Sequence, residues 1–363
     1  MTHRHPPAAA ALAALLLAGA APAQTTYTFT DIHPAGQDNS LCAGISPDGS
    51  RQVGDASTGV FFTNFVGVGG RWAGNAASFA AMTATGYDQT LGIYLNDTDG
   101  TRHVGWAFPQ GTFFTDAMLW NTTNTNGVSI HPTTGGFSDS EATGVSGSLA
   151  CGYAIDGGGA KAGVWSGSGF STFTVIHPAG ALTSSALDIR GTHVVGVAQF
   201  PGPISQAAYW PLATEASFVN LAPPSGYGAS RATATDGIKQ SGFAISNDSG
   251  LNHAMIWSGT ASSFVDVHPP AFDSSRIQGA APGIQVGFGE VGGARQALLW
   301  RGSLGTLVNL HEVLGAGYVE SEAFDVSDSG VVVGYAITTG GASHAILWTP
   351  QGASSAAGWQ LYE

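Results

Sequence analysis

One five-residue pattern recurs along the whole chain: a polar residue, Ala, two apolar residues and Trp. It reads HAMIW at 253–257, QALLW at 296–300 and HAILW at 344–348. With one degenerate copy included, the Trp residues that end the pattern are Trp72, Trp120, Trp165, Trp210, Trp257, Trp300 and Trp348. Their spacing runs from 43 positions (257 to 300) to 48 positions (72 to 120), which is typical of repeats that stack into propellers or solenoids.

Two further markers keep the same register. A Gly precedes each Trp by 13 to 18 positions, at Gly54, Gly105, Gly152, Gly196, Gly242, Gly287 and Gly334. An opening run such as TFTDIHP at 28–34 or SFVDVHP at 263–269 alternates apolar and polar residues, which predicts a half-buried strand. Between the opening run and the Gly, segments such as SEAFDVSDSG at 321–330 predict a second strand closed by a hairpin turn. Each unit therefore predicts four short strands.

A single four-stranded meander cannot bury both of its faces, so neighbouring units must stack. Radial stacking into a closed ring also removes exposed sheet edges, and seven copies predict an all-β, seven-bladed β-propeller of ~46-residue repeats. A β-solenoid is the alternative. The predicted domain covers 24–363, with repeats at roughly 27–72, 77–120, 126–165, 172–210, 217–257, 263–300 and 306–348 and a closing strand at 358–363. Either that strand or the N-terminal opening strand completes the last blade.

The N-terminal segment predicts a secretory signal peptide over 1–23. Basic residues, including Arg4, precede an apolar run from Ala8 to Ala20, and a small-residue cleavage site follows at 21–23. The run is too short to cross a bilayer, and no later segment approaches eighteen uninterrupted apolar residues. We therefore expect a protein with no membrane span that is secreted or extracellular, with the periplasm as a further location.

Composition supports a packed β protein and argues against nucleic acid as a partner. Charged residues are only 10% of the chain, whereas hydrophobic residues are 43% and include nine Trp. The net charge of −13 disfavours phosphate backbones, which need clustered Lys and Arg. The two cysteines, Cys42 and Cys151, align with small core residues of other units, so we expect buried free thiols rather than a disulfide.

The units DVSDSGVVVGYAITTGGASHAILW at 325–348 and GISPDGSRQVGDA at 44–56 resemble the HAF family of bacterial extracellular repeats, named for a His-Ala-Phe triplet before the Trp. Here His-Ala occurs at 253–254 and 344–345, and no copy has Phe third. The resemblance covers essentially 27–363 and implies an exported, propeller-like repeat protein without catalytic residues to carry over. A weaker likeness to kelch blades lies in the Gly-to-Trp spacing.

Histidine is the first candidate for a functional site. His recurs at the end of the opening strand, at His33, His131, His177, His268 and His311. A metal would need several His together, but in a propeller these copies lie on different blades. We therefore expect each imidazole to form a hydrogen bond with the turn that follows its strand. His253 and His344 are also expected to be structural, because other units have Asp, Lys or Gln in their place.

A hairpin with the sequence NDTDG at 96–100 is a weak calcium candidate through Asn96, Asp97 and Asp99, but it lacks the late acidic residue of a full calcium loop. No metal or other cofactor is otherwise indicated. Trp106, in VGWAFPQG, and the first-unit insertion at 61–72 are the places where an exposed aromatic could bind a sugar or peptide. The simpler interpretation is that Trp106 fills the place that Tyr153, Phe243 and Tyr335 hold in other units.

Enzyme motifs are absent, apart from one dinucleotide-like glycine pattern at 287–292 that has no helix after it. We therefore expect a non-catalytic module that binds an extracellular glycan or protein. The alternatives are an extracellular lyase or glycan hydrolase with an active site at the mouth of the channel, and a structural component of a surface layer. A cluster of ionisable side chains at one mouth would favour the enzyme, and a mouth lined by Ser, Thr and Gly would favour binding.

Overall fold

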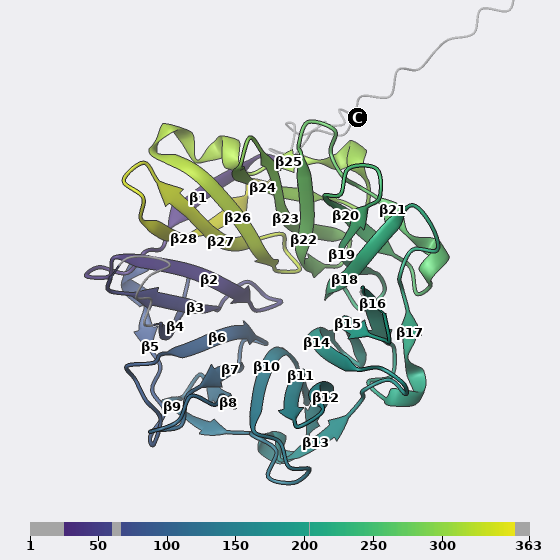
Figure 1. Ribbon diagram of the computed structural model, residues 1–363. Coiled ribbons are helices and arrows are strands. Elements are labelled where there is room, and N and C mark those ends of the chain that lie inside the picture. The colour runs from purple at the N-terminus through teal and green to yellow at the C-terminus, as the bar shows by residue number, and fades with distance from the viewer. Residues whose placement is uncertain (1–24, 60–66, 203, 353–363) are drawn as a thin grey trace, which may run out of the picture.

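A computed structural model describes residues 25–59, 67–202 and 204–352 (Figure 1). Its strands form one eight-stranded sheet and five separate four-stranded sheets, arranged around a common centre. The described part of the chain has no α-helix, only short 3-10 turns, so the all-β prediction is confirmed. These turns are η1 (Ala76–Ser78), η2 (Ser168–Phe170), η3 (Glu215–Ser217), η4 (Ala261–Ser263), η5 (Leu304–Thr306), η6 (His311–Val313) and η7 (Gly315–Gly317).

The eight-stranded sheet consists of β2 (Asn39–Ile45), β3 (Gln52–Ser57), β4 (Val68–Trp72), β5 (Ala80–Ala81), β6 (Ile93–Thr98), β7 (Arg102–Ala107), β8 (Asp116–Asn121) and β9 (Asn124–Ser129). Its two halves, β2–β5 and β6–β9, are each antiparallel. One parallel pair, Val68 with Ile93, is the only strand pairing that joins the described parts of the halves. Each half therefore has the layout of a four-stranded sheet.

The remaining sheets follow in chain order and repeat the same antiparallel layout. Three of them consist of β10 (Asp139–Ser146), β11 (Leu149–Asp156), β12 (Gly159–Ser166) and β13 (Thr172–Val175); β14 (Thr183–Arg190), β15 (His193–Gln199), β16 (Ser205–Trp210) and β17 (Val219–Asn220); and β18 (Tyr227–Thr235), β19 (Gln240–Ser246), β20 (Asn252–Trp257) and β21 (Val265–Asp266). The last two consist of β22 (Ser274–Ala281), β23 (Ile284–Val291), β24 (Ala294–Trp300) and β25 (Val308–Asn309); and β26 (Tyr318–Val326), β27 (Val332–Thr338), β28 (Ser343–Pro350) and β1 (Tyr27–Asp31).

The N-terminal strand completes the last sheet. β1 pairs antiparallel with β28, from Tyr27 opposite Pro350 to Asp31 opposite Ile346, so strands from opposite ends of the chain close a ring rather than leaving the open stack of a solenoid. This answers the question that the sequence left open, although the segment 358–363 lies outside the described residues. Each opening strand thus forms the outer strand of the preceding sheet, and the sequence repeat is offset from the sheets by one strand.

The seven recurring Trp side chains are completely or almost completely buried, with at most 1% of their surface exposed. Five of them donate an indole N–H to the carbonyl that ends the preceding outer strand, as Trp300 does to Val267 at 3.0 Å and Trp348 to Leu310 at 3.1 Å. The indole nitrogens of Trp210 and Trp257 have no acceptor in the described structure. The Trp therefore both fills the space between neighbouring sheets and, in most copies, bonds across it.

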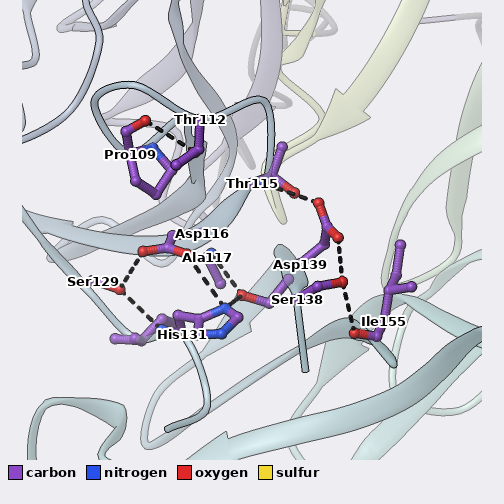
Figure 2. Close-up of polar contacts among 12 residues, drawn as sticks. Pro109, Thr112, Thr115, Asp116, Ala117, Ser129, His131, Ser138, Asp139 and Ile155 are labelled. Carbon is purple, nitrogen blue, oxygen red and sulfur yellow. Dashed lines mark hydrogen bonds and ion pairs between the residues drawn. The ribbon is translucent and has the colours of Figure 1, made fainter. Parts of the chain in front are cut away.

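The recurring His, Ser and Ala form a second link between sheets. His131 Nδ1 lies 2.9 Å from the Ser140 hydroxyl on the next sheet, which accepts the Ala117 N–H from the preceding sheet at 2.9 Å. Figure 2 shows His131 beside Ala117 and Asp116 at this junction. The same three-part contact recurs at His33–Ser40–Ala345, His177–Ser184–Ala162, His268–Ser275–Ala254 and His311–Ser321–Ala297. These histidines are therefore structural.

A ring nitrogen that bonds a carbonyl must carry a proton, because a carbonyl oxygen can only accept. In His33 and His177, Nε2 donates to carbonyls of the following turn, at 2.9 and 3.0 Å, so in the neutral ring Nδ1 accepts the Ser hydroxyl proton. For those two residues the expected bond to the turn is therefore confirmed. Burial, the first cause in each case, lowers the pKa of His33, His268 and His311, in agreement with a neutral ring.

The recurring Gly is required by a bulge in the neighbouring inner strand. Each first strand has a register irregularity next to the residue that faces this Gly, for example between Ala323 and Asp325, and β18 and β26 have a second one nearer their start. A Cβ built on Gly334 would lie 1.9 Å from the Glu322 carbonyl oxygen, and the equivalent glycines meet their neighbouring carbonyls at 1.9 to 2.3 Å. No side chain fits at this distance. Cys42 and Cys151 are both free and buried, as expected.

Candidate functional site

The first strand of each sheet, or of each half of the large sheet, lies nearest the centre of the ring (Figure 1). Together these inner strands line a central channel with two cavities, of about 130 Å³ and about 90 Å³. We call the end where each inner strand turns into the second strand the hairpin end, and the opposite end, where the inner strands begin, the entrance. Both cavities are lined by the same three aspartates, Asp97, Asp188 and Asp325.

These three carboxylates connect sheets across their boundaries. Each accepts an N–H from the sheet that follows: Asp97 from Val145 and Asp188 from Thr235 at 2.7 Å, and Asp325 from Ile45 at 2.9 Å. The other oxygen of each accepts the N–H of the next residue in its own strand. Burial raises the pKa of Asp97 to about 7 and of Asp188 to about 6, and it raises that of Asp325 well above its ordinary value. The charges of the other aspartates add to this for Asp97 and Asp325.

Glycine makes room for each of these aspartates. A Cβ on Gly44 would lie 2.9 Å from the Asp97 Cα, and one on Gly279 would lie 2.6 Å from the Asp325 Cα. Gly144 has the same relation to Asp188, at 3.3 Å. Because neighbouring backbones pack this closely and both oxygens of each carboxylate are bonded, the aspartates belong to the framework of the ring rather than to a free reactive site.

An ion pair spans the hairpin end of the channel. Arg190, at the end of β14, bonds Asp328 in the turn after β26 at 2.7 Å, and the Asp328 N–H bonds the Pro47 carbonyl at 2.9 Å. Turns from three separate parts of the ring therefore contact one another here. The entrance is the end whose side chains differ most from sheet to sheet.

Two positions per sheet define what we call the entrance ring: one on the first strand and its partner on the second. They are the pairs Leu41–Asp55, Tyr94–Trp106, Glu141–Tyr153, Ser185–Val197, Arg231–Phe243, Arg276–Phe288 and Glu322–Tyr335. In sequence, the first member is the variable residue of the Ser-x-Ala motif in most units, and the second follows the recurring Gly. The surrounding residues repeat from unit to unit, whereas these pairs vary: Glu–Tyr and Arg–Phe each occur twice, and the other three pairs occur once.

The three carboxylates of the entrance ring, Asp55, Glu141 and Glu322, have different surroundings. Glu322, with 5% of its side chain exposed, accepts bonds from Arg295 at 2.6 Å, Gln278 at 2.5 Å and Tyr335 at 3.1 Å, so it is held in place. Glu141 has no basic partner. Burial raises its pKa, opposed by a hydrogen bond with Tyr153. Burial also raises the pKa of Asp55, to about 8, and its carboxylate accepts the Leu95 N–H at 3.3 Å. Asp55 is buried, whereas Glu141 is half-buried, so Glu141 is the more accessible of these two groups for proton transfer.

A stack of alternating aromatic rings and guanidinium groups runs from the entrance-ring residue Phe243 into the neighbouring sheet, β22–β25. The Arg276 guanidinium carbon lies 4.5 Å from the centre of the Phe243 ring and 6.0 Å from that of Phe288, and the Arg295 guanidinium carbon lies 4.7 Å from Phe288. Both separations below 5 Å are typical of cation–π contacts. Arg295 is also paired with Glu322, whereas Arg276 has no carboxylate within bonding distance.

The residues that the sequence singled out lie in different places. Trp106 belongs to the entrance ring, at the position held by Tyr153, Phe243 and Tyr335 in other sheets, and its ring stacks on Tyr94 at 4.1 Å. It is half-buried and lies in register, in agreement with the simpler interpretation. Of the first-unit insertion, 60–66 lie outside the described residues, and Val68–Trp72 forms β4.

The three calcium candidates do not converge. The Asn96 side chain donates to the Ala142 carbonyl, Asp97 lines the channel, and Asp99 accepts N–H bonds from Thr101 and Arg102 in its own turn. Within 25–59, 67–202 and 204–352, no group of three His, Cys, Asp or Glu is placed to hold a metal. No helix in these ranges is long and apolar enough to span a membrane.

Sequence reasoning missed the basic side of the entrance ring. Arg231 and Arg276 carry no repeat signal, because the entrance-ring positions vary between units whereas the recurring residues mark the framework. A different signal was present: both arginines occupy the variable place between recurring residues in SRA at 230–232 and SRI at 275–277. Glu141 and Glu322 occupy the same place in their units.

No protein-family model matches the chain, and the search of curated proteins finds no relative. Solved structures do resemble it. The superposition on an oligogalacturonate lyase in complex with manganese has a TM-score of 0.54 at 10% identity, covering 91% of this chain and 99% of that one. The lyase of Vibrio parahaemolyticus gives 0.53 at 8% identity, covering 90% and 98%. A prolyl endopeptidase gives 0.51 at 10% identity, covering 87% of this chain but only 47% of that longer one. At such low identity these likenesses bear on the fold alone, and the fold they share with this chain is a β-propeller.

Proposed function

We propose that this chain is an exported, seven-bladed β-propeller that binds an extracellular ligand at the entrance ring and does not transform it. The count of seven follows if each half of the eight-stranded sheet is one blade, and the single parallel pair between the halves supports this. The predicted signal peptide and the resemblance to HAF repeats support export to the cell surface, the surroundings or the periplasm.

The observation that carries this proposal is the break in the repeat at the entrance ring. Elsewhere each sheet repeats the same Trp, Gly, Ser and Ala, and these residues connect neighbouring sheets. At the entrance ring the pairs change from Leu–Asp to Tyr–Trp, Glu–Tyr, Ser–Val, Arg–Phe and Glu–Tyr. Such an asymmetric surface on a rigid scaffold suits recognition of one particular ligand.

Binding is favoured over catalysis because most acidic groups near the channel are already bonded. The channel aspartates each accept two backbone N–H bonds, and Glu322 accepts three side-chain bonds. A second candidate function is an extracellular lyase or glycan hydrolase. It is supported by Glu141, whose raised pKa and contact with Tyr153 suit a proton donor or acceptor.

Screening of the purified mature chain against a saccharide array and a peptide array tests the proposal. The two entrance-ring variants are Trp106→Ala and Glu141→Gln, and the control is Arg102→Met, at an arginine near the hairpin end that also contacts a Phe ring. We expect a ligand whose binding weakens in at least one entrance-ring variant and stays unchanged in the control. Binding that is equal in all variants would refute the location. Formation of a product by the wild type, lost in Glu141→Gln, would instead establish the enzyme.

A further inference from the structure

We propose that Arg231 and Arg276 form an anion-binding site in the entrance ring that takes the carboxylate of an acidic saccharide. This inference rests on the proposed function, because it names the ligand class of the same site. It concerns two arginines whose equivalents on the other sheets are uncharged or acidic.

The two arginines occupy equivalent places on neighbouring inner strands. Arg231 on β18 pairs with Phe243, and Arg276 on β22 reaches back over the same Phe243 ring. Both arginines therefore neighbour Phe243, Arg231 as its partner in the strand pairing and Arg276 through its guanidinium group. Two residues further along each strand, Thr233 and Gln278 line the smaller channel cavity. The arginines precede these cavity-lining residues on the same inner strands, so they lie nearer the entrance.

Neither arginine is neutralised by a bonded carboxylate. Arg231 is exposed and has no hydrogen-bond or ion-pair partner among the described residues. Arg276 has none either, and its buried Nε is without an acceptor. Burial, followed by the charge of Arg295, lowers the pKa of Arg276; Glu322 opposes this, and Arg231 contributes to it more weakly. A cation held this way favours a ligand that supplies negative charge and hydrogen-bond acceptors.

The nearest carboxylates are already committed to a third arginine. Arg295 bonds Glu322 at 2.6 Å and lies 3.9 Å from Glu290. Three arginines therefore face two glutamates in this cluster, which leaves it with a net positive charge. The chain as a whole has 24 acidic and 11 basic residues, so such a surplus runs against the overall charge. A local positive patch of this kind attracts anionic ligands.

The shape of the entrance ring favours a saccharide as the carrier of the anion. A planar guanidinium fits the two oxygens of a carboxylate, and that of Arg276 lies 4.5 Å from the centre of the Phe243 ring and 6.0 Å from that of Phe288. The half-buried, stacked rings of Tyr94 and Trp106 belong to the same ring of positions and are uncharged. They lie three positions around the ring from Arg231, so an oligosaccharide that spans the entrance could place a uronate group at the arginines and a sugar ring on the aromatic pair.

The test measures binding of short oligogalacturonates by calorimetry, with a neutral oligosaccharide of the same length and a sulfated one as comparisons. The key variant is Arg231→Met, at an exposed position where the fold should tolerate it, with Arg276→Lys as the second variant and Arg102→Met as the matched control. We expect the wild type to bind the uronate oligomer and not the neutral one. The dissociation constant should rise at least ~10-fold in Arg231→Met, rise less in Arg276→Lys, and stay unchanged in the control.

The outcomes separate this inference from the function on which it rests. Uronate binding that Arg231→Met leaves intact but Trp106→Ala weakens would overturn the arginine site and leave the entrance ring as the binding surface. Binding of only the sulfated oligomer would overturn the carboxylate assignment. If the chain binds some ligand and no entrance-ring variant changes that binding, the proposed location fails as a whole. Loss of binding in the Arg102→Met control would also count against the site.

Discussion

The indole hydrogen bonds between sheets can be measured because the chain contains its own control. Trp300 and Trp257 hold equivalent places and are both fully buried, but only Trp300 bonds a carbonyl, that of Val267 at 3.0 Å. Replacing either with Phe removes part of a large ring from the core, which costs about 1–2 kcal/mol. In Trp300→Phe the buried Val267 carbonyl also loses its partner, which costs about 1–3 kcal/mol more.

The difference between the two variants is the predicted quantity. Urea unfolding followed by far-UV circular dichroism gives the free energy of unfolding of each variant, provided that the wild type unfolds in one cooperative step. We expect Trp300→Phe to lose more stability than Trp257→Phe by about 1–3 kcal/mol. Equal losses would refute the reasoning, since they would mean that the inter-sheet hydrogen bond contributes nothing beyond the volume of the ring.

Three more predictions concern the framework. Burial raises the pKa of Asp188 from 3.8 to about 6, so its neutral form contributes stability that is complete below pH 4 and is lost as the pH rises through 6, by about 3 kcal/mol. Asp188→Asn should remove this part of the pH dependence of the free energy of unfolding. If urea titrations from pH 4 to 8 give the same pH dependence for the variant as for the wild type, the assignment is wrong. Gly334→Ala should prevent folding or cost more than about 3 kcal/mol because its Cβ would meet a carbonyl at 1.9 Å, whereas Gly305→Ala, in open space, should change the melting temperature little. Ser275→Ala should cost more than Ser230→Ala, by roughly 1 kcal/mol in thermal unfolding, because only the first serine also bonds a histidine; equal costs would argue against that bond.

The all-β fold was predictable because the same pattern of buried and turn residues occurs seven times in the sequence. Trp fills the space between sheets, Gly makes room for a carbonyl of the neighbouring strand, and Ser accepts an N–H from Ala on the preceding sheet. These residues recur because the same contacts recur around the ring. The assignment of the opening strand was harder to predict. In sequence TFTDIHP heads its unit, but in space β1 belongs with β26–β28, and only the long-range pairing shows this.

The candidate site was less predictable for the opposite reason. The entrance ring is made of residues that vary between units, and a single sequence cannot distinguish functional variation from neutral variation. The contact of Arg276 with Phe243 joins two sheets, and the pairing of Glu322 with Arg295 also crosses a sheet boundary. Of the channel aspartates, only Asp97 was singled out from the sequence, as part of a hairpin, and the approach of Asp97, Asp188 and Asp325 from three sheets is visible only in the folded chain.

Closure by β1 has a consequence for where the chain can be cut. The Gln351 N–H bonds the Thr26 carbonyl at 2.8 Å, so the first and last described segments of the chain lie side by side. A short linker between them, with new termini opened in a surface loop between two other sheets, would convert the inter-terminal seam into an ordinary covalent connection. Such a circular permutant would keep every strand neighbour described above. The architecture therefore does not depend on where the termini lie, and any of the sheets could be the one that a strand from the other end of the chain completes.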